Sequence, residues 1–332
     1  MALRRRWRRM GMALAWLAVG LVFLWALAAL SFVKGPSYPV RVAWVVALVA
    51  VPVVARWTGL EGVRFLGATL AGAALAGVVW WLFAPSNDRR WWEEQAVHPT
   101  GASDGERVTI QGFRVFRADD EPIRYEAHAL DLAALERLWF GVETFPGWEG
   151  GAHTFLSFQV ADGPFVSVSV ESRREAGEAF DPVHGLFKAY ELVYVIGDER
   201  EVVGRRGGLT GAPAYLYPIR TTAEGRQRLL LDIVRRSTEL ARQPEHYNTL
   251  TNNCTSNLAE HVHAIAPRTL PSYDLRTVFP GYADRLLYEL DLIDTELPFE
   301  EARARFRIDG RVGGRIGDDF SWRVRDLPPP PS

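Results

Sequence analysis

The chain has 332 residues and is nearly neutral overall, with 38 basic and 40 acidic side chains. The charges are unevenly distributed, because residues 1–84 hold nine basic residues and one acidic residue and leave 29 basic and 39 acidic residues for the remainder. An acidic soluble part excludes nucleic acid as an expected partner, since phosphate backbones are bound by clustered positive charge.

Apolar segments in residues 1–84 predict three transmembrane helices at about 11–33, 40–57 and 63–83. The first segment has no charged residue from Gly11 to Val33, and as a helix it would measure about 34 Å, enough to cross a bilayer. The second segment is the shortest. A signal peptide is the alternative for the first, because Ala26-Leu27-Ala28 resembles a cleavage site.

The arginines of "RRRWRR" precede the first segment and predict a cytoplasmic amino terminus by the positive-inside rule. Three crossings then place the soluble part in the periplasm of a Gram-negative bacterium, anchored in the inner membrane. If the short second segment did not cross, the soluble part would be cytoplasmic instead.

Beyond the membrane segments we expect a linker at 85–105, one soluble domain at 106–325 and a disordered tail at 326–332, which contains "LPPPPS". Alternating apolar residues predict strands at "RVTIQGFRVFR", "AHTFLSFQV", "FVSVSVES", "AYELVYVI" and "AYLYPI". This pattern indicates an α+β domain with an antiparallel sheet.

Three helices are predicted in the soluble domain. The spacing of apolar residues over Leu130–Phe140 favours a helix. A capping box beginning at Thr221 opens a second helix that ends near Gln243, and a third runs from Cys254 to Ile265 and stops before Pro267.

The central hairpin has a predictable arrangement of faces. Pairing Leu156 with Val170 and Phe158 with Val168 would join the apolar faces of its two strands. That register places Glu171 opposite Phe155 and diagonal to His153, within reach of its long side chain. Ser169 lies on the same face as His153.

Cys254 is the only cysteine and stands where a helix is predicted to begin. Unpaired N–H groups at a helix start stabilise an anion and lower the pKa of a thiol placed there. The polar neighbours Asn253 and Thr255 favour a cleft at this position. A thiolate attacking a carbonyl would also need a histidine as base and a carboxylate to orient that histidine. The alternative is a buried, structural cysteine.

Other candidate sites are less specific. Arg173 and Arg174 are candidates to bind a phosphate or carboxylate headgroup, although a solvated face is the simpler interpretation. His261 and His263 are two residues apart and point to different sides of a helix, which disfavours a zinc pair. The glycine-rich stretch at 204–211 lacks the lysine of a phosphate loop and is interpreted as a plain loop. We expect no cofactor and no metal.

The segments "AHTFLSFQVADGPFVSVSVESRREAGEAFDPVHGLFKAYELVYVIGDER", "YLYPI" and "YNTLTNNCTSN" resemble the Lnb N-terminal periplasmic domain family, over roughly residues 108–295. The family is marked by one histidine and an "NCT" motif. The resemblance implies that His153 is the family histidine and that Cys254 and Thr255 belong to the motif. It also implies a fold similar to permuted papain-like (NlpC-type) thiol enzymes.

The family is named after a lipoprotein N-acyltransferase that moves an acyl chain from a phospholipid to a lipoprotein. The resemblance therefore implies acyl transfer through a thioester on Cys254, with His153 as base and Glu171 orienting it, and a membrane lipid or lipoprotein as substrate. This chain has its apolar segments before the domain and lacks an extended membrane region after it, so the substrate stays open. The alternatives are an amidase or peptidase acting on envelope peptides and a non-catalytic binding module.

Overall fold

The computed structural model describes residues 2–116, 122–161, 164–205, 212–266, 270–271, 274–312 and 316–328. These residues form two compact units, one made of Met1–Ser86 with Asp181–Tyr190 and the other of Asn87–Phe180 with Glu191–Ser332. Most of the glycine-rich stretch and the end of the predicted disordered tail lie outside the described residues.

The first unit contains α1 (Ala2–Phe32), α2 (Tyr38–Trp57) and α3 (Gly62–Leu82). All three are long and apolar enough to cross a membrane, with mean hydropathies of 2.4 for Arg9–Phe32 in α1, 1.9 for α2 and 1.8 for α3. Small and aliphatic residues pack where the helices meet: Ala26, Leu30, Leu48, Ala73 and Ala76. The prediction of three potential spanning helices is confirmed, including the short second one.

The segment Asp181–Tyr190 also belongs to the first unit and contains the 3-10 turn η3 (His184–Leu186). The Nζ of Lys188 donates to the carbonyl oxygens of Trp80, Trp81 and Phe83 at 3.1–3.2 Å. A cation at this position satisfies the open carbonyls at the end of α3 and opposes the negative end of its dipole. The ring of Phe32 lies 5.9 Å from that of Phe187.

The second unit is built on one mixed sheet with the strand order β1-β2-β7-β6-β5-β4-β8, and β3 pairs with β2. Its strands are β1 (Thr100–Ser103), β2 (Arg107–Val115), β3 (Arg124–Asp131), β4 (Leu135–Phe145), β5 (Trp148–Val160), β6 (Val166–Arg173), β7 (Glu191–Asp198) and β8 (Ala214–Ile219). The α+β class is confirmed. The sheet, expected to be antiparallel, is mixed, because β2 and β7 pair in parallel at Arg114 and Gly197.

The helices of this unit are α5 (Ala223–Arg242), α6 (Cys254–Ile265), α7 (Leu275–Val278), α8 (Ala283–Glu289), α9 (Phe299–Arg305), α10 (Asp309–Val312) and α11 (Phe320–Arg325). Short helical turns are η1 (Glu93–Gln95), η2 (Leu132–Ala134), the π-helix η4 (Arg200–Gly204) and η5 (Pro280–Tyr282). The predicted bounds of α6 are confirmed.

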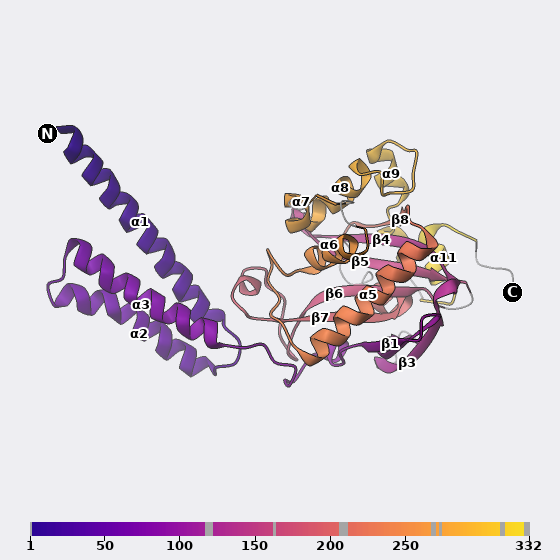
Figure 1. The fold of residues 1–332 in the computed structure, drawn as a ribbon, viewed down its shortest axis with the longest axis horizontal. Coiled ribbons are helices and arrows are strands. Elements are labelled where there is room, and N and C mark those ends of the chain that lie inside the picture. The colour runs from indigo at the N-terminus through magenta and orange to yellow at the C-terminus, as the bar shows by residue number, and fades with distance from the viewer. Residues whose placement is uncertain are drawn as a thin grey trace. The chain divides into compact units, whose positions relative to one another are not determined.

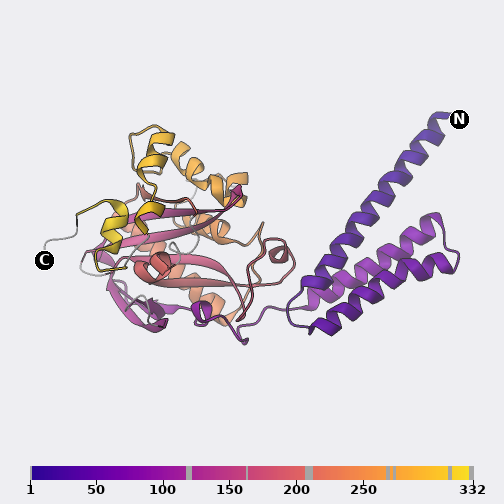
Figure 2. The same cartoon turned by 180° about the vertical axis from the view of Figure 1, so that it is seen from behind.

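Both faces of the sheet are covered. In Figure 1, α5 and α6 lie in front of the strands, and in Figure 2 the yellow C-terminal segment lies on the opposite side. Residues of this second face form one apolar cluster: Trp139, Phe155, Val203, Ala214, Leu216, Ile308, Val312, Phe320 and Val324. Because both faces are packed, β5 is buried along almost its whole length instead of alternating between core and solvent.

Three predictions about this unit are wrong in detail. The predicted helix at Leu130–Phe140 is the end of β3, the turn η2 and the start of β4. The hairpin pairs Leu156 with Val168 and Phe158 with Val166, two residues from the predicted register, although the same faces meet. The predicted linker at 85–105 contributes η1 and strand β1 to the compact unit.

Candidate functional site

Cys254 is the first residue of α6, and its neighbours fix the start of that helix. The backbone of Asn253 is extended, its side chain accepts a hydrogen bond from the N–H of Ser256 at 2.9 Å, and the Oγ of Ser256 accepts from the N–H of Asn253 at 2.9 Å. This reciprocal capping box satisfies the N–H groups of Asn253 and Ser256. The N–H groups of Cys254 and Thr255 lie in the same turn and are not used by the cap. Among the described residues no acceptor binds these two N–H groups.

The thiol lies inside the protein beside two hydroxyl groups. Cys254 is 5% exposed, and its Sγ is 3.7 Å from the Oγ1 of Thr255. That oxygen is in turn 3.0 Å from the Oγ1 of Thr154 on β5. The first turn of α6 is therefore bound to the face of the sheet that carries Thr154.

His153 is half-buried and belongs to a second group of polar side chains. Its Nε2 lies 2.7 Å from the Oγ of Ser169, and that hydroxyl donates to the Oε1 of Glu171 at 2.8 Å. The other carboxylate oxygen of Glu171 accepts from the Nε2 of Gln95 at 2.7 Å. Since Ser169 has one hydroxyl proton and gives it to the carboxylate, Nε2 of His153 carries the proton in their shared bond.

This arrangement corrects how Glu171 reaches His153. Ser169, and not Glu171, is the residue paired with Phe155 across the hairpin, and it stands between the carboxylate and the imidazole. Glu171 therefore connects to His153 through a hydroxyl group. The contact of Gln95 with Glu171 was not predicted, because the two residues are 76 positions apart in the sequence and Gln95 lies in the predicted linker.

His153 and Thr154 are adjacent in β5, and their side chains lie on opposite faces of the sheet. Thr154 faces α6, and successive side chains of a strand alternate between faces. His153 consequently lies on the face of Phe155, which packs in the cluster with Phe320 and Leu216. Among the described residues no hydrogen bond joins the Sγ of Cys254 to the imidazole of His153.

Arg173 and Arg174 hold the segment that leaves the membrane unit. Arg173 is 2% exposed, donates to the carbonyls of Gln95 and Ala96 at 2.9 and 2.7 Å, and stacks on the ring of Trp91 at 4.3 Å. Burial lowers the pKa of Arg173 to about 10. Arg174 lies 4.1 Å over the ring of another tryptophan, Trp92. Both side chains therefore make specific contacts within the domain, whereas the simpler interpretation of the sequence placed them on a solvated face.

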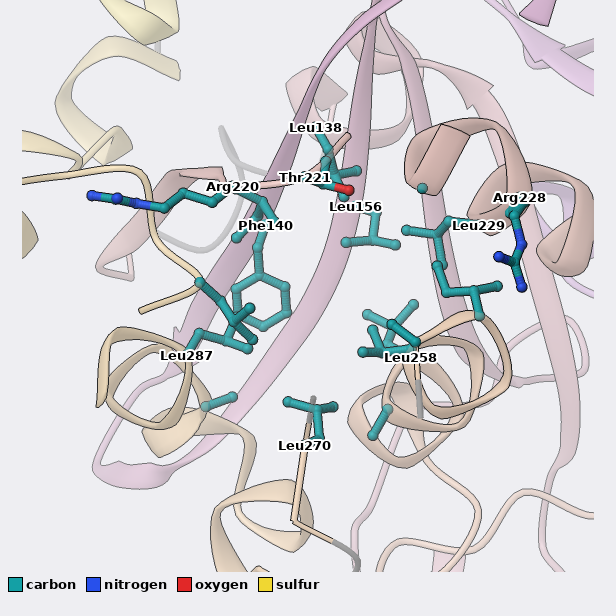
Figure 3. A pocket seen from close by; sticks show the side chains of 18 of the residues that line it. Leu138, Phe140, Leu156, Arg220, Thr221, Arg228, Leu229, Leu258, Leu270 and Leu287 are labelled. Carbon is teal, nitrogen blue, oxygen red and sulfur yellow. The ribbon is translucent and has the colours of Figure 1, made fainter. Parts of the chain in front are cut away.

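An apolar cavity of about 400 Å³ opens next to the start of α6. It lies between the sheet and helices α5, α6 and α8, and Thr255 is part of its wall. Most of its lining is aliphatic or aromatic: Leu138, Phe140, Leu156, Ile219, Leu229, Leu258, Ala259, Val262, Ile265, Leu270, Leu286, Leu287 and Leu292. Figure 3 shows Leu156, Leu258 and Leu287 converging on the space, whereas the charged ends of Arg220 and Arg228 extend outward.

A buried histidine on α6 ties this helix to its surroundings. His261 is 3% exposed, its Nε2 lies 2.7 Å from the hydroxyl of Tyr194, and its Nδ1 lies 2.7 Å from the Oδ2 of Asp232. Burial is the largest influence on the imidazole and lowers the pKa of His261. These contacts of His261 were not predicted from the sequence, where the residue was a candidate only for a disfavoured zinc pair. In the part of the chain that the structure describes, no cluster of three or more His, Cys, Asp or Glu residues is placed to hold a metal ion.

Residues 123–281 match the family model of the Lnb N-terminal periplasmic domain. Over these residues the chain is similar to that family. The match confirms the resemblance drawn from the sequence, and it includes His153, Cys254 and the strands between them. The comparison with curated proteins and the comparison with solved structures each gave no match. This match and the three apolar helices fit a membrane-anchored protein with a periplasmic domain.

Proposed function

We propose that this protein is a cysteine-dependent acyltransferase that takes an acyl chain from a membrane lipid and passes it to a lipoprotein or another amine. The observation that supports this proposal is the apolar cavity whose wall includes Thr255, the residue next to Cys254. An acyl chain in this cavity would have its carboxyl end beside the thiol. Anchoring by the membrane helices raises the effective concentration of lipid substrates near the domain.

The lining of the cavity supports a lipid chain over an envelope peptide. Each buried methylene group contributes about 0.8 kcal/mol, so a long acyl chain gains substantially from an aliphatic wall. A polar peptide would lose hydrogen bonds to water there without replacement. Amide hydrolysis of envelope peptides, the alternative that uses the same residues, is therefore less well supported.

The proposed chemistry has two steps. In the first, the thiolate of Cys254 attacks the ester carbonyl of the lipid, the carbon–oxygen bond breaks, and the released alcohol takes up a proton. In the second, an amine attacks the thioester, an amide forms, and the thiol is regenerated. The N–H groups of Cys254 and Thr255 at the start of α6 are suited to bind the negative oxygen of each tetrahedral intermediate.

His153 is the proposed base. Since its Nε2 is protonated in the bond to Ser169, the proton of the thiol would be taken by Nδ1. The imidazole must also reach the thiol from the opposite face of β5, so this role requires a rearrangement at the end of the strand. Glu171 would hold the tautomer through Ser169.

A non-catalytic acyl-chain-binding module is the second candidate. It is favoured by one observation, namely that His153 and the start of α6 lie on different faces of the sheet. In this alternative the cavity would still bind lipid chains, and Cys254 would be a small buried side chain.

The test uses the full chain in lipid nanodiscs that contain a phospholipid with a labelled acyl chain. We expect intact-protein mass spectrometry to find one added acyl group, released by hydroxylamine, and none in Cys254→Ser. Addition of an amine-bearing lipoprotein peptide should then transfer the label to the peptide. Labelled lipid retained without a covalent adduct would support the binding module and contradict the acyltransferase.

A further inference from the structure

A second cavity, of about 200 Å³, lies on the other face of the sheet from α6. Strands β4 and β8 form one side through Trp139, Leu216 and Pro218, and helices α10 and α11 contribute Arg311 and Val324. It shares no lining residue with the apolar cavity beside Thr255. A ligand in this second cavity would therefore bind away from the site of the proposed acyl transfer.

The charged groups of this cavity are mostly positive. Its walls contain four arginines and one acidic residue: Arg137, Arg305, Arg311, Arg325 and Asp294. The carboxylate of Asp294 also lies 3.6 Å from Arg220, outside the cavity. The concentration of positive charge stands out in a soluble part that carries 29 basic and 39 acidic residues.

Two of these arginines have no carboxylate bound to them within the described residues. Arg311 donates to the carbonyl oxygens of Val324, Arg305 and Arg307 at 2.9–3.1 Å, which leaves its charge uncompensated. Arg137 is exposed and forms no ion pair among the described residues. Arg325 differs, because Glu199 accepts its hydrogen bonds at 2.6 and 2.7 Å.

Two buried N–H groups beside the cavity lack an acceptor. The Nε1 of Trp139 and the Nε of Arg325 are inaccessible to solvent and have no hydrogen-bond partner among the described residues. The guanidinium of Arg325 lies 4.7 Å over the ring of Trp139, so the two groups belong to one cluster. Buried donors are normally satisfied, and these two belong to residues in the wall of a cavity whose charged groups are mostly positive.

We propose that this cavity is a binding site for a phosphate group carried by a small organic molecule or by a lipid headgroup. A phosphate offers several acceptor oxygens at once and matches the forked guanidinium groups that surround the cavity. The apolar side chains of Leu216, Val324 and Leu327 are part of the wall and can contact a carbon skeleton attached to the phosphate. The proposal does not rest on the acyltransferase activity.

The test measures binding of inorganic phosphate and of glycerol 3-phosphate to the full chain in phosphatidylcholine nanodiscs, by calorimetry at fixed ionic strength. Arg137→Gln removes an exposed charge that has no ion pair in the described structure, so the domain should fold. We expect it to weaken binding at least tenfold. Trp139→Phe removes the indole N–H together with one of the two fused rings and should weaken binding severalfold. Arg107→Gln, the same charge change at the far strand β2, should alter the affinity less than twofold.

A third arm replaces part of the phosphatidylcholine by phosphatidic acid. Competition between these nanodiscs and glycerol 3-phosphate, lost in Arg137→Gln, would identify a lipid headgroup as the source of the phosphate. Binding of the soluble compounds without such competition would identify a soluble phosphate ester. The proposal is overturned if neither soluble compound binds at 10-millimolar concentration, or if Arg137→Gln and Arg107→Gln bind equally well.

Discussion

The hydroxyl groups of Thr154 and Thr255 lie 3.0 Å apart and join the strand β5 to the first turn of α6. Both side chains are buried, at 0% and 5% exposure. The position of Cys254 relative to the sheet depends on this contact, because Cys254 precedes Thr255 directly in the chain. The contact also holds α6, and with it the thiol, on the face of the sheet opposite to His153.

Replacing either threonine of this pair should destabilise the domain. We expect Thr255→Val and Thr154→Val each to cost about 1–2 kcal/mol, because each leaves a buried hydroxyl group without its partner. The double variant should cost less than the sum of the two, since it leaves no orphaned hydroxyl. Thermal unfolding of the full chain in detergent measures all three variants, and strictly additive effects would show that the two hydroxyls do not interact.

Filling the apolar cavity should change which acyl chains the protein accepts. Ala259 lines the cavity, so Ala259→Phe should reduce acylation from a 16-carbon phospholipid at least tenfold while a 6-carbon chain is used almost as well. Ala264→Phe makes the same substitution at an exposed position of α6 and serves as the matched control. The adduct is measured by mass spectrometry. Equal losses for both chain lengths would mean that the chain does not enter this cavity.

The proposed role of His153 predicts a loss that depends on pH. We expect His153→Gln to slow thioester formation by about 100-fold at pH 7. The deficit should shrink by pH 9.5, because hydroxide in solution can remove the thiol proton there without a general base. Ser169→Ala, which removes the bridge to Glu171, should cause a smaller loss at pH 7. A deficit that stays constant from pH 7 to pH 9.5 would assign His153 a structural role.

His98 should make the soluble unit sensitive to acid. Burial, with a smaller contribution from the charge of Arg173, lowers the pKa of His98 to about 3, whereas the unfolded chain keeps a value near 6.5. Between these two values only the unfolded state binds the proton, so stability is complete above pH 6.5 and falls as the pH drops toward 3. At about 1.4 kcal/mol per pH unit, the loss by pH 4 is roughly 3.5 kcal/mol at most.

His98→Phe keeps a ring of similar shape and removes this titration. We expect the melting temperature of the variant to fall less between pH 7 and pH 4 than that of the wild type. Part of the acid sensitivity should persist, because burial also lowers the pKa values of His128 and His261. An unchanged slope in the variant would mean that His98 binds its proton equally well in the folded and unfolded states.

The sequence predicted the elements that are defined by local chemistry. The start of α6 follows from Asn253 and Ser256, which form the cap within four residues, and the apolar helices follow from hydropathy alone. The strand β4 was missed because helices cover both faces of the sheet, and a strand buried on both sides loses the alternation that identifies it. Its leucines then matched a helical spacing instead.

The candidate site was predicted only in part. The shared face of His153, Ser169 and Glu171 follows from strand alternation, which depends only on whether the register is odd or even. The register itself was wrong by two residues, because the same faces meet after such a shift and only the hairpin turn distinguishes the two pairings. The contact of Gln95 with Glu171 and that of Tyr194 with His261 join distant parts of the chain and leave no local pattern.

The segment Asp181–Tyr190 affects how the periplasmic part can be separated from its anchor. Its residues Phe187 and Lys188 contact Phe32 and the end of α3, so the polypeptide meets the membrane helices again long after leaving them at residue 86. A single protease cut after Ser86 would therefore leave the released portion attached to the helices through this loop. A truncated protein that begins at Asn87 would expose the aromatic side of the loop to water and should be prone to aggregation unless Phe187 is replaced by a polar residue.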